Sequence, residues 1–170
     1  IKPVESPVSL RNIGVTEIKR NPGGNRDISK AIQSLPGVAT QVSFRNDIVI
    51  RGNSPVGVLW RIDGMNISNP NHFASVGTTG GAVSALNTNL LKNSDFFTSA
   101  FPAEYGNALA GVFDMKLRTG NSEKREHTVQ FGVLGLDIAS EGPFKTGGKA
   151  TFLFNYRYST LGLLQPLLPA

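Results

Sequence analysis

The chain has 170 residues, enough for one domain or for one domain with an appendage, and its 19 glycines and 10 prolines indicate a turn-rich globular protein. It contains no cysteine, which excludes disulfide bonds and thiolate metal sites. The net charge of +5 is spread in small groups, so we expect no nucleic-acid partner, and the longest apolar run, residues 131–136, is too short for a transmembrane helix.

Two short helices are predicted near the start of the chain. A helical turn over residues 16–20 is expected to end before Pro22. A stronger pattern follows at residues 27–35, where Asp27 is a suitable N-cap and Pro36 stops the helix. Apolar residues recur there with helical spacing and predict one buried face: Ile28, Ala31, Ile32 and Leu35.

Two apolar, β-branched runs at residues 48–51 and 57–63 predict a hairpin or a pair of sheet strands, separated by a turn at residues 54–57. Arg51 lies at the edge of the first run. A charge at the edge of a buried strand needs a partner, so the identity of that partner bears on the function of the protein.

The middle of the chain predicts a connection, a helix and a strand. Residues 64–81 are polar and rich in Asn and Gly, which is typical of a long loop. Residues 82–92 predict a helix or helical turn, whose buried side would carry Val83, Leu86, Leu90 and Leu91. A strand over residues 112–118 then completes, up to about residue 120, a small mixed α+β domain.

The last part of the chain has a different pattern. Residues 126–141 and 149–160 predict two long strands joined by a turn. In the second strand aromatic residues alternate with polar ones, and one face carries Ala150, Phe152, Phe154, Tyr156 and Tyr158. A soluble sheet could bury this face in its core. Strands of this length exceed the roughly 5–6 residues usual in globular sheets, and they fit a membrane β-barrel, in which lipid-facing and lumen-facing residues alternate.

Several short motifs occur in a fixed order before these strands. They are LPGV at residues 35–38, IVIRG at 48–52, RIDG at 61–64, AEYGNALAGV at 103–112 and LRTG at 117–120. Together with the aromatic hairpin, this ordered set resembles the plug domain of a TonB-dependent outer-membrane transporter and the first strands of its barrel. The resemblance implies an α+β fold, with a small mixed-sheet plug domain with short helices at residues 1–120. A two-stranded β-hairpin from a truncated transmembrane β-barrel would follow at residues 121–170.

The resemblance also implies a function. A complete member of this family binds a scarce nutrient outside the bacterial outer membrane, and a TonB-type inner-membrane energy transducer drives its uptake past the plug in the barrel lumen. The implied partners are the protein's own β-barrel, the energy transducer, outer-membrane lipid and a small nutrient ligand. An isolated hairpin would also leave open edges, so a strand-swapped oligomer is expected for such a fragment.

Neither catalysis nor a cofactor is expected. The chain has two histidines, no Gly-X-Ser-X-Gly motif, and no Lys-Ser/Thr pair after the glycines at residues 77–81 that would make a phosphate loop. The sequence begins at Ile1 without an initiator methionine, and we expect it to be a segment of a longer protein.

The family implies a latch between plug and barrel. In relatives the arginine of the IRG motif reaches glutamates of the barrel wall, a role that carries over to Arg51. Many relatives have a second arginine just before the AEYG stretch, where this chain has Thr98 or Ser99, so half of the latch is missing. Without the barrel glutamates we expect Arg51 to be exposed or paired with a local acid. The alternative is a strand-end residue whose charged group simply reaches solvent.

Family plugs also present apical loops to the ligand. By order these match residues 41–45, 53–56 and 66–75. Their amide, cationic and aromatic groups suit a polar ligand with an apolar part, and the candidates are Phe44, Arg45, Asn53, Ser54, Asn69, Asn71, His72 and Phe73. Asn and Ser are also ordinary turn formers, which would explain any one of them without a ligand. One histidine among amides is a poor transition-metal site, so we expect no metal.

A competing interpretation is a free-standing extracellular α+β binding or adhesion module whose last strands belong to its own sheet. It requires Phe152, Phe154 and Tyr156 to be buried within one molecule. The plug-and-barrel interpretation leaves these side chains accessible, because a barrel cannot close with two strands.

Overall fold

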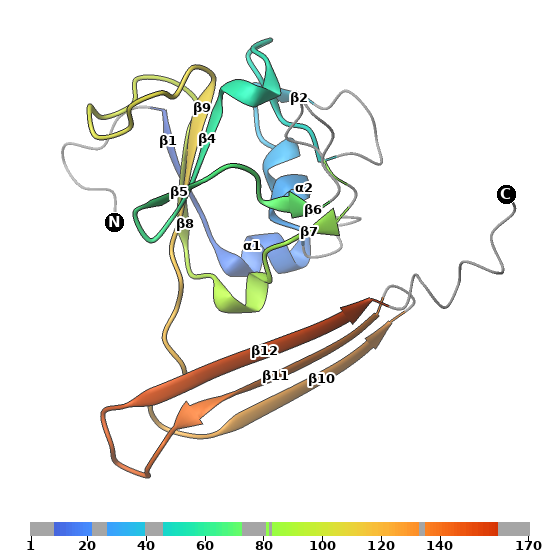
Figure 1. The fold of residues 1–170 in the computed structure, drawn as a ribbon, viewed down its shortest axis with the longest axis vertical. Helices are drawn as coiled ribbons and strands as arrows, with labels where there is room; N and C mark the ends of the chain where they lie inside the picture. Colours follow the sequence, from blue (N-terminus) through green and yellow to red (C-terminus); the bar gives the residue numbers. More distant parts are fainter. Residues whose placement is uncertain are drawn as a thin grey trace, which may run out of the picture. The chain divides into compact units, whose positions relative to one another are not determined.

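A computed structural model describes residues 9–21, 27–39, 46–72, 81, 83–132 and 135–159 of the chain (Figure 1). The chain divides into two compact units, Ile1–Leu117 and Arg118–Ala170. The predicted α+β class is confirmed. Among the residues described, none of the helices is both long enough and apolar enough to cross a membrane.

The first unit is built on a five-stranded mixed sheet with the order β1-β8-β9-β4-β5. The strands are β1 (Leu10–Ile13), β8 (Ser94–Phe97), β9 (Gly111–Met115), β4 (Val58–Ile62) and β5 (Met65–Ile67). The β4–β9 pair is parallel and the other three pairs are antiparallel. Of the five strands of this sheet, β9 comes last along the chain, and it lies in the middle of the sheet.

Two short helices pack against one face of this sheet, and both were predicted. They are α1 (Val15–Arg20) and α2 (Ile28–Gln33). The Asp27 carboxylate caps α2 by accepting a hydrogen bond from the Ser29 N–H at 2.8 Å. The predicted apolar face is buried, with Ile28, Ala31, Ile32 and Leu35 each at most 7% exposed.

The main core lies between the helices and the sheet. Its centre is a row of three buried rings, in which Phe113 makes edge-on contacts with Trp60 at 5.6 Å and with Phe96 at 5.8 Å between ring centroids. A smaller cluster of Phe97, Tyr105 and Val112 lies on the opposite face of the sheet. Because neighbouring strand residues point to opposite faces, the sheet carries a core on each side.

The two runs around Arg51 form separate sheet strands and not a hairpin, which was the other arrangement predicted. The first is β3 (Val49–Ile50), which pairs with β2 (Val38–Ala39), whereas the second is β4 of the main sheet. Arg51 and Gly52 both have positive φ, 49° and 79°, and the short 3₁₀ helix η1 (Pro55–Gly57) follows. This left-handed turn sends the chain from one sheet into the other, so the two strands are not partners.

Of the helix or helical turn predicted at residues 82–92, the described part of the segment contains a helical turn and no α-helix. That segment contains β7 (Val83–Ser84), which pairs with β6 (Asn71–His72), and the 3₁₀ helix η2 (Thr88–Leu90). The Ser84 hydroxyl accepts from the Leu86 N–H, and the Asn87 side chain accepts from the Asn89 N–H. These local bonds compete with a helical ladder. The apolar residues still reach the core, since Leu91 is buried and Leu86 packs against it.

The second unit is a three-stranded antiparallel sheet of β10 (Glu126–Gly132), β11 (Gly135–Pro143) and β12 (Thr151–Ser159). The predicted strand over residues 126–141 is therefore two strands, and the predicted two-stranded hairpin has one strand too few. The chain reverses between Gly132 and Gly135, which are register partners. Gly135 has a φ of 154°, a backbone conformation that glycine adopts most readily.

Candidate functional site

The described residues of the predicted ligand loops have different surroundings. Phe44, Arg45 and Phe73 lie outside the described residues. Asn53, Ser54 and His72 are exposed. The other two candidates belong to the framework, because the Asn69 side chain accepts from the Asn71 N–H at 2.9 Å, and Asn71 is buried. A role in turn formation thus accounts for Asn69 without a ligand.

The first unit also contains a buried polar cluster that the sequence did not reveal. The Asn46 side-chain amide donates to Asp27 Oδ2 at 2.6 Å and to Asn71 Oδ1 at 3.1 Å. All three residues are at most 9% exposed. Burial raises the pKa of the Asp27 carboxyl above its ordinary value, against the opposing effect of the hydrogen bonds from Ser29 and Asn46. The cluster joins the start of α2 to Asn46, which follows residues 41–45, and to Asn71, which lies within residues 66–75.

Arg51 is exposed, as expected, and it lines a cleft of about 570 Å³ in the first unit. The other lining residues include Arg11 of β1 and both Thr98 and Ser99. Among the described residues no Asp or Glu lines the cleft, and neither Arg11 nor Arg51 has an ion-pair partner there. Two guanidinium groups in one open cleft suit an anionic group such as a carboxylate.

A line of polar residues crosses the face of the sheet opposite the helices. Each strand contributes one residue at the same register, in the order Asn12, Asp95, Asp114, Arg61 and Asn66. Asp95 accepts from Asn12 at 2.8 Å and pairs with Lys116 at 3.0 Å. The hydrogen bond to Asp95 raises the pKa of Lys116. Asp95 and Asp114 are therefore like charges side by side on this line, and each has a cation of the same unit near it, since Lys116 pairs with Asp95 and Arg61 is the register partner of Asp114.

Tyr105 of the AEYG motif fastens its loop to this polar line. Its hydroxyl donates to Asp114 Oδ2 at 3.0 Å, the Arg61 guanidinium lies 5.3 Å from its ring centroid, and its ring packs on Phe97. Burial, together with the Asp114 carboxylate, raises the pKa of Tyr105. The other oxygen of Asp114 is buried without a hydrogen bond, so Tyr105 is the donor that satisfies this carboxylate within the described residues.

We expect Tyr105→Phe to destabilise the first unit by about 1–3 kcal/mol, because the buried Asp114 carboxylate loses that donor. Urea unfolding of the chain, followed by the fluorescence of Trp60, measures the change. Tyr158→Phe is the matched control, since Tyr158 is half exposed in the second unit. Equal unfolding midpoints for the two variants would contradict the assigned role.

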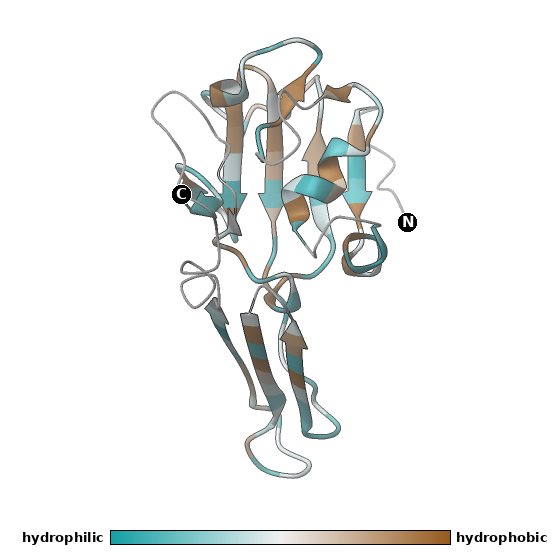
Figure 2. Ribbon diagram, turned by 90° about the vertical axis from the view of Figure 1, so that its right-hand side faces the viewer, coloured by the Kyte–Doolittle hydropathy of each residue, from teal (hydrophilic) through white to brown (hydrophobic). Residues whose placement is uncertain are grey.

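The second unit presents an apolar face to solvent. This face consists of residues in register across its strands, namely Val129, Phe131, Leu136, Ile138, Phe154, Tyr156 and Tyr158. Phe131 is 86% exposed and Val129 69%. Figure 2 shows hydrophobic and hydrophilic residues alternating along these strands.

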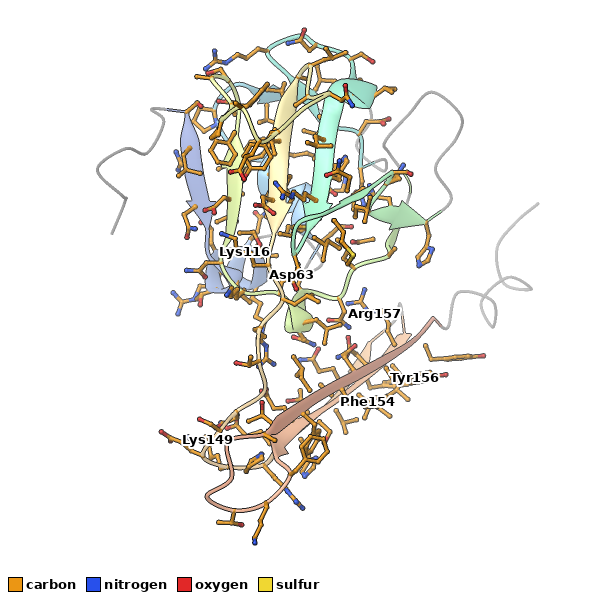
Figure 3. The ribbon with its side chains drawn as sticks, turned by 60° about the vertical axis from the view of Figure 1, so that its left-hand side comes forward. Asp63, Lys116, Lys149, Phe154, Tyr156 and Arg157 are labelled. Carbon is orange, nitrogen blue, oxygen red and sulfur yellow. The ribbon has the colours of Figure 1, made fainter. Side chains whose placement is uncertain are left out.

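The opposite face of the same sheet is polar. Asp137 accepts from Asn155 at 2.8 Å and pairs with Arg157 at 3.4 Å, and Figure 3 shows Arg157 on the other side of β12 from Phe154 and Tyr156. Phe154 is 56% and Tyr156 50% exposed, whereas Phe152 packs on the ring of Phe144. The adhesion-module interpretation needs all three aromatic residues buried, but Phe152 is half-buried and the other two are exposed.

Comparison with known proteins identifies a family that matches most of the chain. The family model described as "TonB-dependent Receptor Plug Domain" matches residues 2–112. A curated relative, the "Uncharacterized protein YddB" of Escherichia coli (strain K12), is 29% identical over 140 residues. The match covers 71% of this chain but 18% of YddB, so the chain spans less than a fifth of that relative.

Proposed function

Because the chain belongs to the family of TonB-dependent receptor plug domains, we propose that it comprises the gate of an outer-membrane transporter and the first strands of the barrel that the gate closes. The gate corresponds to the plug-like residues 1–120, and the barrel strands follow in residues 121–170. Membership of this non-enzymatic family argues against a catalytic role.

The observation that carries the proposal is the apolar face of the second unit. It is exposed, and it belongs to strands that directly follow the plug match. β11 and β12 have 9 residues each and are roughly 30 Å long when extended, as transmembrane strands are. An apolar face opposite a polar one fits a barrel wall between lipid and lumen.

The proposed partners follow from this placement. Outer-membrane lipid would cover the apolar face, and further strands of the same barrel would pair with the open edges of β10 and β12. In an isolated chain those edges would pair between copies, which gives the strand-swapped oligomer. A carboxylate of the barrel wall would occupy the cleft of Arg11 and Arg51, and a TonB-type transducer would supply the energy.

The nutrient would bind at the loops named from the sequence. Asn53, Ser54 and His72 are exposed, and Phe44, Arg45 and Phe73 remain predicted contacts. The Asp27–Asn46–Asn71 cluster would hold these loops in place from below rather than touch the ligand.

The test places an arginine on each face of β12 in the full-length protein, expressed in a bacterium with an outer membrane. Tyr156→Arg should reduce assembly strongly, because an arginine facing lipid near the middle of a bilayer costs about 2–4 kcal/mol. Outer-membrane fractionation and heat-modifiable gel migration measure assembly.

Asn155→Arg is the matched control on the polar face and should assemble normally. Recovery of the wild-type protein from the soluble fraction would contradict the proposal. Equal assembly of the two variants would do so as well.

A further inference from the structure

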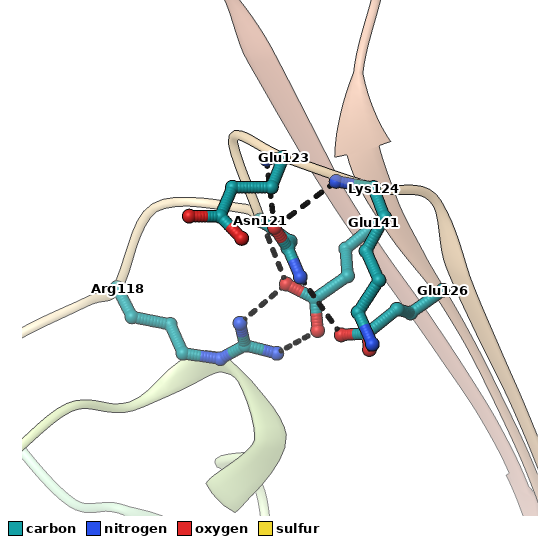
Figure 4. A network of polar contacts seen from close by, with 6 residues as sticks. All are labelled: Arg118, Asn121, Glu123, Lys124, Glu126 and Glu141. Atoms are coloured by element: carbon teal, nitrogen blue, oxygen red, sulfur yellow. Dashed lines mark hydrogen bonds and ion pairs between the residues drawn. The ribbon is translucent and has the colours of Figure 1, made fainter.

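The segment that follows the first unit, residues 118–125, is fastened to the sheet of the second unit by polar contacts (Figure 4). We call this segment the linker. The Arg118 guanidinium donates to both oxygens of Glu141, at 2.6 and 2.8 Å. The Asn121 N–H adds a third bond to the same carboxylate at 3.0 Å. A two-pronged ion pair of this kind fixes orientation as well as distance.

A second carboxylate belongs to the same network. Glu126 of β10 is the register partner of Glu141 on β11, so two negative charges lie side by side on one face of the sheet. The Asn121 side-chain amide donates to Glu126 at 3.1 Å, and the Lys124 ammonium lies 2.8 Å from it. The linker thus supplies the groups that neutralise a charge pair which would otherwise repel. We call Arg118, Asn121, Glu126 and Glu141 the linker clamp.

The clamp is partly shielded from water. The side chains of Arg118 and Glu141 are 30% and 17% exposed, unlike the freely solvated pairs that contribute little. The hydrogen bond to Glu141 raises the pKa of Arg118, as expected for a guanidinium held by a carboxylate.

The rest of the linker also lies close to the backbone of the second unit, at Gly120 and at Arg125. A Cβ at Gly120 would lie 2.1 Å from the carbonyl oxygen of Phe152, so only glycine fits there. The Arg125 guanidinium donates to the carbonyl oxygens of Pro143 and Phe144 at 3.2 and 3.0 Å. On the side of the first unit, the Leu117 N–H donates to Asp63 Oδ1 at 3.1 Å. The chain is therefore held immediately before and immediately after the boundary between the units.

We propose that the linker clamp anchors the gate to the barrel wall at Arg118, so that the linker does not act as a flexible connection between the two. This inference rests on the proposed function. Eight freed residues, fully extended, would span up to roughly 26–29 Å. With the clamp closed, a gate that moves during transport stays tethered at its last residue. With the clamp open, the gate could swing away from its seat by the length of the linker.

The first experiment measures the clamp itself, by amide hydrogen exchange of residues 118–126 in the full-length protein. Glu141→Ala removes the acceptor of the Asn121 N–H, and the exchange of that amide should become roughly 10- to 100-fold faster, the loss expected for a hydrogen bond to a charged group. Glu123→Ala is the matched control, because the exposed Glu123 carboxylate makes no contact within the described residues. Unchanged exchange in Glu141→Ala would overturn the clamp.

The second experiment measures its consequence for the gate. Each variant is expressed in a bacterium with an outer membrane, and the sensitivity of the cells to vancomycin is measured. An intact outer membrane excludes vancomycin, so increased sensitivity reports a displaced gate. Glu141→Ala and Arg118→Ala should increase sensitivity, and the charge exchange R118E/E141R should restore part of the barrier and of the exchange protection. Faster exchange without added sensitivity would overturn the anchoring role.

Assembly distinguishes the two proposals. Heat-modifiable migration of each variant shows whether the barrel has formed, and the charge exchange keeps the test valid if a single variant fails to assemble. Absence of the wild-type protein from the outer membrane would refute the proposed function. Protection of residues 118–126 in that wild-type protein would still support the clamp.

Discussion

Replacing Phe113 with alanine is expected to lower the free energy of unfolding of the first unit by about 3–5 kcal/mol. The Phe113 ring is fully buried at the centre of the main core, between the rings of Trp60 and Phe96. Its removal loses both edge-on contacts and leaves a cavity between the sheet and the helices. These elements cannot move far enough to close that cavity. A loss of this size is a large fraction of the stability of an ordinary domain.

The chain contains the means to measure this effect. Trp60 is its single tryptophan and is 1% exposed, so its fluorescence reports unfolding of the core that Phe113 belongs to. Phe131→Ala is the matched control, since Phe131 is 86% exposed in the second unit. We expect the control to leave the tryptophan transition in urea unchanged. A shift in Phe113→Ala no larger than that of the control would contradict the described core.

The second large effect is expected for Asp27→Ala, which should destabilise the first unit by about 2–4 kcal/mol. Loss of the helix cap on α2 contributes about 1 kcal/mol. The buried Asn46 amide also loses the acceptor at 2.6 Å, which adds about 1–3 kcal/mol. Urea unfolding measures the loss, and Glu17→Ala, at an exposed acid on α1, is the control with little expected effect.

Asp27→Asn separates capping from ionisation. An asparagine caps a helix as well as an aspartate does, so this variant should lose less stability than Asp27→Ala. The folded-state pKa of Asp27 is raised above its ordinary value of 3.8. The pH-dependent part of its contribution to the free energy of unfolding is therefore fully present below pH 3.8 and is lost as the pH rises through the folded-state pKa. The variant should show a flatter dependence of stability on pH over that window. An unchanged dependence would exclude Asp27 as its source.

Local features of the fold could be predicted from the sequence, because their causes lie within a few residues. The cap at Asp27 and the spacing of Ile28, Ala31 and Ile32 are sufficient to define α2. Strand pairing is different. β4 has its parallel partner in β9, far along the chain, and β3 has its partner in the two-residue strand β2. Nothing in the composition of a short apolar run identifies which other run it will pair with.

The candidate sites follow the same rule. Exposure of Arg51 could be predicted, because the turn residues that surround it are local. The polar line through Asp114 and Arg61 depends on the register of strands from separate parts of the chain. The ion pair between Arg118 and Glu141 depends on the chain reversal after Gly132, which places β11 beside β10. The sequence pattern of residues 126–141 does not show that reversal. One usable signal was alternation within β4, which places Arg61 on the face opposite Trp60.

The position of β9 bears on how the first unit acquires its structure. Its neighbours β4 and β8 are both made earlier, and β9 must be inserted between them before either has a complete set of backbone partners. Formation of the sheet therefore waits for a pairing between distant parts of the chain, and such topologies fold slowly. Until residues 111–115 arrive, β4 and β8 expose edges that can pair with other chains. A polypeptide with this topology needs protection from aggregation during its biogenesis. Pairing of β9, the last strand of this sheet to be made, completes the native structure of the first unit.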